Sequence, residues 1–237
     1  EAKGKLEAEL LLADAYSRQG NYDKAAECYR KVTQTNPEQG VAWRQLGLIS
    51  YYLGQYSEAV RSLSESLKRS PDDWQVLEHL GLAYAELEQD DQAIALLERL
   101  VEADQAGTQA SVELAELYAR TGQAEKAQET IQKALDKGED QAGLYFTLGV
   151  LQYDNRRTAE AEASLKKVLE LEPEHKGAML YLGLVYDRME RLDLLEATIR
   201  QALAQDDTFA EGYNLLGYAL ADRGLRLDQA EQLLLKA

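Results

Sequence analysis

The feature that most constrains this chain is a spacing of residues that recurs every 34 positions. Residues 40–73 show it clearly, because Leu46, Gly47, Ala59 and Pro71 stand where similar residues recur in neighbouring segments. Within each period the apolar residues fall at i, i+3, i+4 and i+7 on either side of a turn, which is the pattern of two amphipathic helices. Strand-like alternation is absent throughout. The sequence therefore predicts an all-α chain of helix pairs.

Seven units follow one another without a gap, and we expect them to form a single solenoid over residues 1–237. Their bounds are 6–39, 40–73, 74–107, 108–141, 142–175, 176–209 and 210–237, the last being truncated and having one extra residue in its central turn. One frame places leucine at the seventh position of all seven units. Units of this kind bury their apolar faces by stacking.

Small residues occupy two fixed positions of the repeat. The eighth position holds Gly or Ala, and six of the seven second helices carry an Ala. Because Gly costs up to about 1 kcal/mol relative to Ala in a helix, we expect close helix approach to offset that cost, with Gly47 opposite Ala59. Leu195 replaces the small residue in the sixth unit and is expected to widen the packing there. Prolines close three units, since proline lacks the N–H donor that a helix interior needs.

This pattern resembles the tetratricopeptide repeat family over residues 6–237. The resemblance implies a right-handed α-solenoid superhelix of about seven antiparallel helix pairs, in which first helices line a concave groove and second helices face outward. It also implies a non-catalytic scaffold, since most members bind peptides or protein segments in the groove.

Charge and composition exclude several classes of partner. The chain has 26 Lys and Arg against 42 Asp and Glu, a net charge of −16, which opposes nucleic acid and anionic lipid surfaces. No apolar run approaches the roughly 20 residues that cross a bilayer, and residues 1–10 lack the features of a signal peptide. We therefore expect no nucleic-acid partner and no membrane insertion.

The chain has few of the residues that most often act in catalysis or bind metal ions. The chain has two histidines, His79 and His175, and one cysteine, Cys28. Neither histidine has a Cys or His within ligand spacing, so no metal site, cofactor or enzymatic activity is expected. Cys28 cannot form an intramolecular disulfide and is interpreted as an inert, partly buried thiol. Pairs of aspartates at turns, at residues 72–73, 90–91 and 206–207, are interpreted as helix caps.

In the family, first-helix positions 2, 5, 6, 9, 12 and 13 face the groove. Five tyrosines at such positions are not required by the repeat, and Tyr is enriched where partners bind; packing against the next unit is the alternative. The candidate ligand-binding residues are Arg44, Tyr51, Tyr52, His79, Glu113, Arg120, Phe146, Tyr153, Tyr181, Arg188, Asn214 and Tyr218.

Acids outnumber bases at these positions, which favours an amphipathic partner segment carrying Lys or Arg. Family members that grip a C-terminal carboxylate use Lys, Asn and Arg at fixed sites. The matching sites here hold Leu10, Asp14, Gln45, Gln75 and His79, so that mode is not supported.

Two further functions stay open. One is a self-assembling structural module that forms homo-oligomers, because no polar terminal helix covers the last repeat. The other is the recognition arm of a larger enzyme or protease complex. Residues 214–237 are similar to units of bacterial members, several of them exported or lipid-anchored, which favours the cell envelope over the cytoplasm as location.

Overall fold

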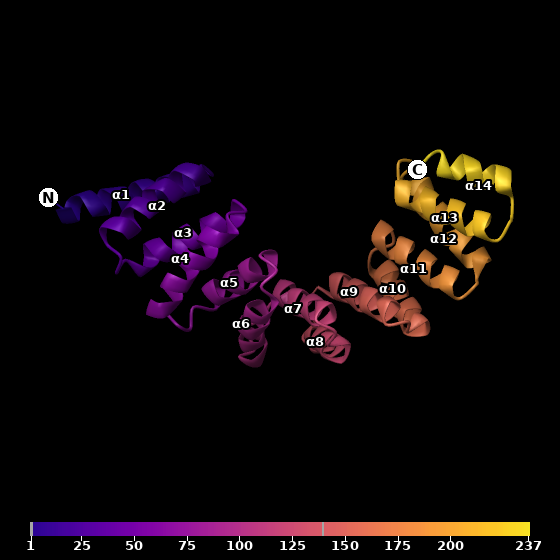
Figure 1. The fold of residues 1–237 in the computed structure, drawn as a ribbon, viewed down its shortest axis with the longest axis horizontal. Coiled ribbons are helices and arrows are strands. Elements are labelled where there is room, and N and C mark those ends of the chain that lie inside the picture. The colour runs from indigo at the N-terminus through magenta and orange to yellow at the C-terminus, as the bar shows by residue number, and fades with distance from the viewer. Residues whose placement is uncertain (1, 139) are drawn as a thin grey trace. The chain divides into compact units, whose positions relative to one another are not determined.

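The computed structural model describes residues 2–138 and 140–237, and these residues form helices joined by short turns, with no strand among them (Figure 1). The helices are α1 (Ala2–Arg18), α2 (Tyr22–Thr35), α3 (Gly40–Tyr52), α4 (Tyr56–Arg69), α5 (Trp74–Glu86), α6 (Asp90–Glu102), α7 (Thr108–Arg120), α8 (Ala124–Asp136), α9 (Gln141–Asp154), α10 (Thr158–Leu171), α11 (Lys176–Arg188), α12 (Leu192–Gln205), α13 (Ala210–Asp222) and α14 (Leu227–Leu234). The all-α solenoid predicted from the sequence is confirmed.

The chain divides into two compact units, Glu1–Gly122 and Gln123–Ala237. In unit 1, α1 packs on α2, α3 on α4 and α5 on α6, and each second helix also contacts the first helix of the next pair. Unit 2 repeats this arrangement with α9 to α14, and α8 packs on α9. Five first helices begin at the first residue of a predicted repeat, because the 34-residue period sets where each pair starts.

The glycines at the eighth repeat position allow the two helices of a pair to approach closely. A Cβ atom on Gly47 would lie 2.6 Å from the Leu63 side chain, and one on Gly149 would lie 2.8 Å from Leu165. The predicted close approach is therefore present, but the residue facing Gly47 is Leu63 and not Ala59. Leu63 lies about one helical turn after Ala59, and both are fully buried.

Each unit has clusters of buried apolar side chains at the repeat positions. In unit 1, Tyr29 and Val32 of α2 cluster with Leu46 of α3. In unit 2, Leu195 is fully buried in the same cluster as Ile199 and Leu216. Second helices thus contribute to the core on both of their sides, which holds successive first helices side by side.

Two of the three aspartate pairs contain a helix cap, as predicted. Asp73 caps α5, its Oδ1 accepting from the Val76 N–H at 3.2 Å. Asp90 instead lies inside the first turn of α6, whose N-cap is Gln89. Asp206 ends α12 and accepts hydrogen bonds from both the backbone N–H and the hydroxyl of Thr208. The cap interpretation is therefore wrong for the 90–91 pair, whereas Asp206 is the C-cap residue of α12.

The central turn of each helix pair contains a residue with left-handed backbone geometry. Gly54 has φ of 70° there, but Glu88, Arg156 and Glu190 occupy the equivalent positions with φ of 56°, 61° and 58°. The seventh pair has the predicted longer turn, residues 223–226. None of the described helices combines the length and the apolarity needed to span a bilayer.

Candidate functional site

Two tyrosines at the end of α3 pack against a histidine of α5. The Tyr51 and Tyr52 rings lie 5.3 Å and 5.7 Å from the His79 ring, both at steep angles. His79 Nδ1 lies 2.9 Å from the carbonyl oxygen of Gln75, and Nε2 lies 3.2 Å from the Tyr52 hydroxyl. Since a carbonyl only accepts, Nδ1 carries the proton, and in the neutral ring Nε2 accepts from Tyr52. His79 is thus a buried support for the tyrosines.

The two tyrosines differ in exposure. Tyr51 is half-buried against the core cluster that contains Leu63, and burial, followed by the charge of Glu86, raises its pKa to about 12. Tyr52 is 65% exposed. We call Tyr51, Tyr52 and His79 the unit 1 aromatic cluster. Tyr51 anchors it, and Tyr52 presents its ring to solvent in an orientation fixed by the hydrogen bond to His79.

Carboxylates of α5 and α7 lie near this cluster. Burial first, and then the charges of Glu116 and Glu86, raise the pKa of Glu113. Burial also raises the pKa of Glu116. Glu86 and Glu113 both act electrostatically on the Tyr51 hydroxyl. These side chains therefore make the face beside the aromatic cluster negatively charged.

The two basic candidates of unit 1 are held by aspartates. Arg120 donates from Nε and Nη2 to the two carboxylate oxygens of Asp90, at 2.9 Å and 2.5 Å. Arg44 donates from Nε to Asp73 at 2.9 Å and also contacts Gln75. Both arginines tie one helix pair to another, so they have a packing role, and their ligand-binding role stays a prediction.

In unit 2 the structure gathers the aromatic candidates of α9 and α11. The Tyr181 ring lies 5.7 Å from Phe146 and 5.9 Å from Tyr153, in both cases edge to face. The Arg188 guanidinium lies 3.8 Å from the centre of the Tyr153 ring and donates to the Tyr153 carbonyl. We call Phe146, Tyr153, Tyr181 and His175 the unit 2 aromatic cluster.

His175 is a member of that cluster that sequence reasoning missed. Its ring lies 4.8 Å from the Phe146 ring, and its Nδ1 accepts from the Ala178 N–H at 3.0 Å, which caps α11. Phe146 and His175 stand 29 residues apart, five fewer than one repeat. The residue one repeat after Phe146 is Leu180, so the repeat frame alone does not point to His175.

Two candidates on α13 stand apart from these clusters. Tyr218 is 68% exposed and Asn214 is exposed as well. Among the described residues neither takes part in the ring contacts that join Phe146, Tyr153 and Tyr181. The exposed aromatics at groove positions are therefore Tyr52 in unit 1 and Tyr218 in unit 2.

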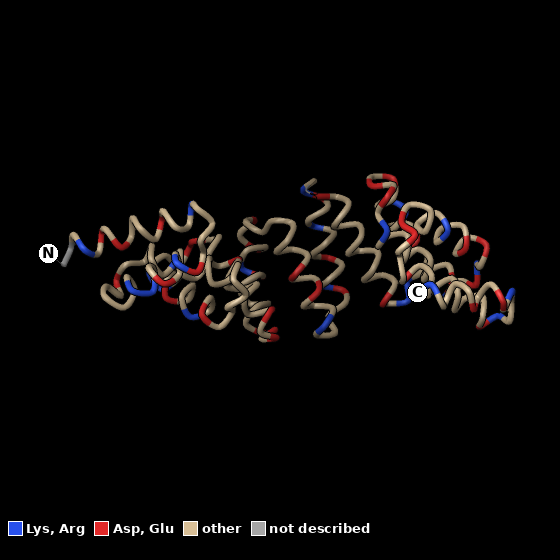
Figure 2. Tube along the Cα trace, turned by 90° about the horizontal axis from the view of Figure 1, so that it is seen from above, with Lys and Arg blue, Asp and Glu red and all other residues tan. Residues whose placement is uncertain are grey.

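Acidic and basic residues are interspersed along the chain trace in Figure 2. At the groove positions, however, Arg44 and Arg120 are ion-paired and Arg188 is stacked on Tyr153. Two acids at these positions are also engaged, because Asp14 accepts a hydrogen bond from the Tyr29 hydroxyl of α2 and Asp187 is ion-paired with Arg223. Glu113 and Glu116 form no ion pair with any described residue, but the positive charge of Arg120 acts on both carboxylates and lowers their pKa values in part.

The described residues hold no cluster of three or more His, Cys, Asp or Glu side chains that could bind a metal ion. Cys28 is buried, in agreement with its interpretation as a packed thiol. Both histidine rings use Nδ1 in local hydrogen bonds.

Comparisons with known proteins agree with this geometry. A tetratricopeptide repeat model matches residues 44–108 and 146–206, more than half of the chain, and a second one matches residues 6–49. The chain belongs to the tetratricopeptide repeat family. Residues 86–168 also match the model of anaphase-promoting complex, cyclosome, subunit 3. A comparison with curated proteins finds no match.

Solved structures of repeat proteins share the fold. A tetratricopeptide repeat protein from Parabacteroides merdae aligns with a TM-score of 0.77 at 17% identity, covering 98% of both chains. The C-terminal part of a repeat protein from Cytophaga hutchinsonii aligns with a TM-score of 0.76 at 17% identity, covering 96% of this chain and 93% of its own. YrrB, described as having an unusual peptide-binding site, aligns with a TM-score of 0.65 at 18% identity, covering 84% of this chain and all of its own. Tetratricopeptide repeat proteins are in general protein-interaction scaffolds, and this chain has their fold.

Proposed function

We propose that this chain is a non-catalytic scaffold that binds a peptide or protein segment on the groove side of its first helices. The observation that carries the proposal is Tyr52, which is 65% exposed although its hydroxyl is held by the buried His79. An exposed aromatic ring that is already oriented loses little side-chain entropy when a partner covers it. A packing role alone would not leave this ring in solvent.

The proposed ligand is an amphipathic segment. Its apolar side chains would cover Tyr52, while Lys or Arg side chains would meet the carboxylates of Glu113 and Glu116. The net charge of −16 favours such a segment over nucleic acid. The peptide-binding site described for YrrB supports the general mode, since that protein shares the fold with this chain.

Selection from a random peptide library tests the proposal and does not require an identified partner. Peptides of about 12 residues would be selected on the purified chain, and their affinities measured by fluorescence anisotropy. The test variant is Tyr52→Ala with Tyr218→Ala, because both side chains are about two-thirds exposed. Tyr51 and Tyr153 are less suitable, since both pack against core clusters.

Tyr22→Ala is the matched control, because Tyr22 is exposed but lies on α2, a second helix. We expect the double variant to weaken the selected peptides by about tenfold or more, and the control to leave them unchanged. Peptides that bind the wild type and the double variant equally well would contradict the proposal.

A further inference from the structure

We propose that unit 2 has a second binding surface, a cleft between the second helices α12 and α14 that takes an acidic segment of a partner protein. The cleft has a volume of about 360 Å³ and is partly open to solvent. The residues that line it include Arg200, Leu203, Tyr213, Gln229, Leu233 and Lys236. They lie on α12, α13 and α14, at the C-terminal end of the chain (Figure 1). None of them stands at a groove position of the repeat, so this cleft is distinct from the surface in the proposed function.

The repeat places an arginine of one second helix opposite a side chain of the next second helix. In unit 1, Arg30 of α2 donates from Nε and Nη2 to the two carboxylate oxygens of Glu58 of α4, at 2.9 Å and 2.6 Å. Arg200 of α12 stands at the repeat position of Arg30. With the extra residue of the seventh central turn counted, Gln229 of α14 stands at the position of Glu58. Arg200 therefore lacks the acid from the next second helix that Arg30 has.

The positive charge around the cleft exceeds the negative charge that the protein supplies there. Arg200 pairs with Glu196 of its own helix at 2.8 Å, but Arg226 also donates to both carboxylate oxygens of Glu196. Lys236 forms no ion pair with any described residue, and its Nζ lies 5.6 Å from the centre of the Tyr213 ring. The described residues that line the cleft include no Asp or Glu. A partner carboxylate would be attracted to Arg200 and Lys236.

The cleft also offers a free hydroxyl and apolar surface. Tyr213 is buried, and its hydroxyl has no hydrogen-bond partner among the residues that the structure describes. Trp43, at the same repeat position in unit 1, instead donates its indole N–H to the Pro37 carbonyl at 2.7 Å. Leu203 and Leu233 line the cleft together with Tyr213. An Asp or Glu side chain beside a large apolar side chain matches this arrangement, whereas a basic side chain would be repelled.

A protein segment is the occupant that the shape of the cleft favours. Pockets for small molecules usually bury roughly 70–90% of the ligand surface, whereas this cleft stays partly open. At physiological ionic strength, exposed charges more than about 8 Å away are largely screened. The net charge of −16 on the whole chain therefore does not prevent an acidic segment from reaching Arg200 and Lys236.

Peptide selection tests the cleft without an identified partner. A random peptide library would be depleted on Arg200→Gln with Lys236→Gln and then selected on the wild-type chain. We expect the enriched peptides to share an Asp or Glu beside a large apolar residue. Fluorescence anisotropy would measure their affinities. If no peptides were enriched, or only peptides without acidic residues, the proposed cleft would be overturned.

Gln229→Glu is a second test variant, because it gives Arg200 the internal partner that Glu58 gives Arg30 and removes no cation. We expect it to weaken the enriched peptides by about tenfold or more without lowering the thermal stability of the chain. Gln201→Glu is the matched control, since Gln201 is an exposed residue of α12 that does not line the cleft. We expect the control to weaken the peptides by less than about threefold. Equal losses in the two variants would overturn the cleft.

The groove variant, Tyr52→Ala with Tyr218→Ala, separates the cleft from the proposed function. We expect the enriched peptides to bind this variant as tightly as the wild type. Peptides that depend on Tyr52 and Tyr218 but bind Gln229→Glu normally would overturn the cleft and leave the proposed function standing. Replacing the acidic residue of a peptide with its amide should abolish the difference between the wild type and Gln229→Glu. Circular dichroism establishes that each variant is folded.

Discussion

Asp73 holds two elements of unit 1 with one carboxylate. Its Oδ2 accepts from Arg44 Nε of α3 at 2.9 Å, and its Oδ1 accepts from the Val76 N–H at the start of α5. We expect Asp73→Ala to lower the free energy of unfolding by about 1–2 kcal/mol, because it removes a helix cap together with a partly exposed ion pair. Chemical denaturation by urea measures this change.

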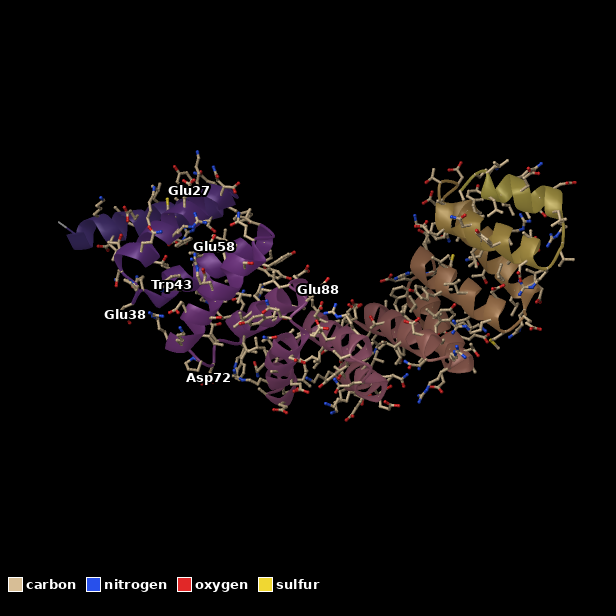
Figure 3. The ribbon with its side chains drawn as sticks, in the orientation of Figure 1. Glu27, Glu38, Trp43, Glu58, Asp72 and Glu88 are labelled. Carbon is tan, nitrogen blue, oxygen red and sulfur yellow. The ribbon has the colours of Figure 1, made fainter. Side chains whose placement is uncertain are left out.

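The neighbouring Asp72 is the control for that prediction. It is exposed in the turn between α4 and α5 (Figure 3). We expect Asp72→Ala to change the free energy of unfolding by no more than about 0.5 kcal/mol. If Asp72→Ala and Asp73→Ala lowered the free energy of unfolding equally, the cap and ion pair of Asp73 would not contribute to stability.

Gly47 provides a test of helix packing. Helix propensity alone predicts that Gly→Ala stabilises by up to about 1 kcal/mol. A Cβ atom at Gly47 would lie 2.6 Å from the Leu63 side chain and 2.9 Å from its backbone nitrogen, so the helices of the pair must separate. We expect Gly47→Ala to destabilise by about 1–2 kcal/mol in thermal or urea unfolding. Gly4→Ala, where nothing lies within 4 Å, should be neutral or stabilising; the same result at Gly47 would refute the packing argument.

Adjacent tyrosines should respond differently to truncation. Tyr51 is half-buried against a core cluster, so we expect Tyr51→Ala to cost about 2–3 kcal/mol of unfolding free energy. Tyr52 is mostly exposed, and Tyr52→Ala should cost less than about 1 kcal/mol. Urea unfolding of both variants measures the contrast. If Tyr52→Ala were the more destabilising, its ring would serve the fold rather than a ligand.

The raised pKa values of Glu113 and Glu116 predict a pH dependence with a definite sign. Burial first, and then the charges of Glu116, Glu86 and Asp90, place the Glu113 pKa above its ordinary value of 4.5, while Arg120 opposes this shift. The folded chain therefore binds more protons than the unfolded chain just above pH 4.5. These two groups destabilise the fold at neutral pH, and that penalty shrinks as the pH falls through their folded pKa values towards 4.5.

Comparison with Glu113→Gln and Glu116→Gln isolates this effect. The double variant should be more stable than the wild type at pH 7, and the difference should decrease as the pH approaches 4.5. Affinity for a basic peptide should fall over the same range, because a neutral carboxyl no longer attracts the cation. Unfolding and peptide-binding measurements at the same pH values check both trends. A stability difference between the double variant and the wild type that grows as the pH falls would contradict the raised pKa values of Glu113 and Glu116.

Much of the fold was accessible from the sequence, because repeated local signals agree with one another. The spacing of Leu46, Gly47 and Pro71 defines both where a helix pair starts and which side is buried. The partner of Gly47 was misassigned, since choosing between Ala59 and Leu63 requires the rotation of one helix relative to another. Periodicity does not define that rotation.

The candidate site was predicted less completely. Position in the repeat selected Tyr52 as a groove residue, and the structure leaves its ring exposed, but position did not show that Arg44 and Arg120 are engaged by Asp73 and Asp90. These partners lie about one repeat away in sequence and meet only through stacking of helix pairs. An ion pair of this kind depends on side-chain reach across two helices, which composition and spacing do not specify.

The central turns have a consequence for how such chains are recognised. Left-handed geometry at this position favours glycine, yet Glu88, Arg156 and Glu190 adopt it, each at a cost of roughly 1 kcal/mol. The packed helices on both sides hold the turn closed whichever residue occupies it. A search pattern that demanded glycine there would overlook three of the seven helix pairs, whereas one based on the leucine at the seventh repeat position would find them all.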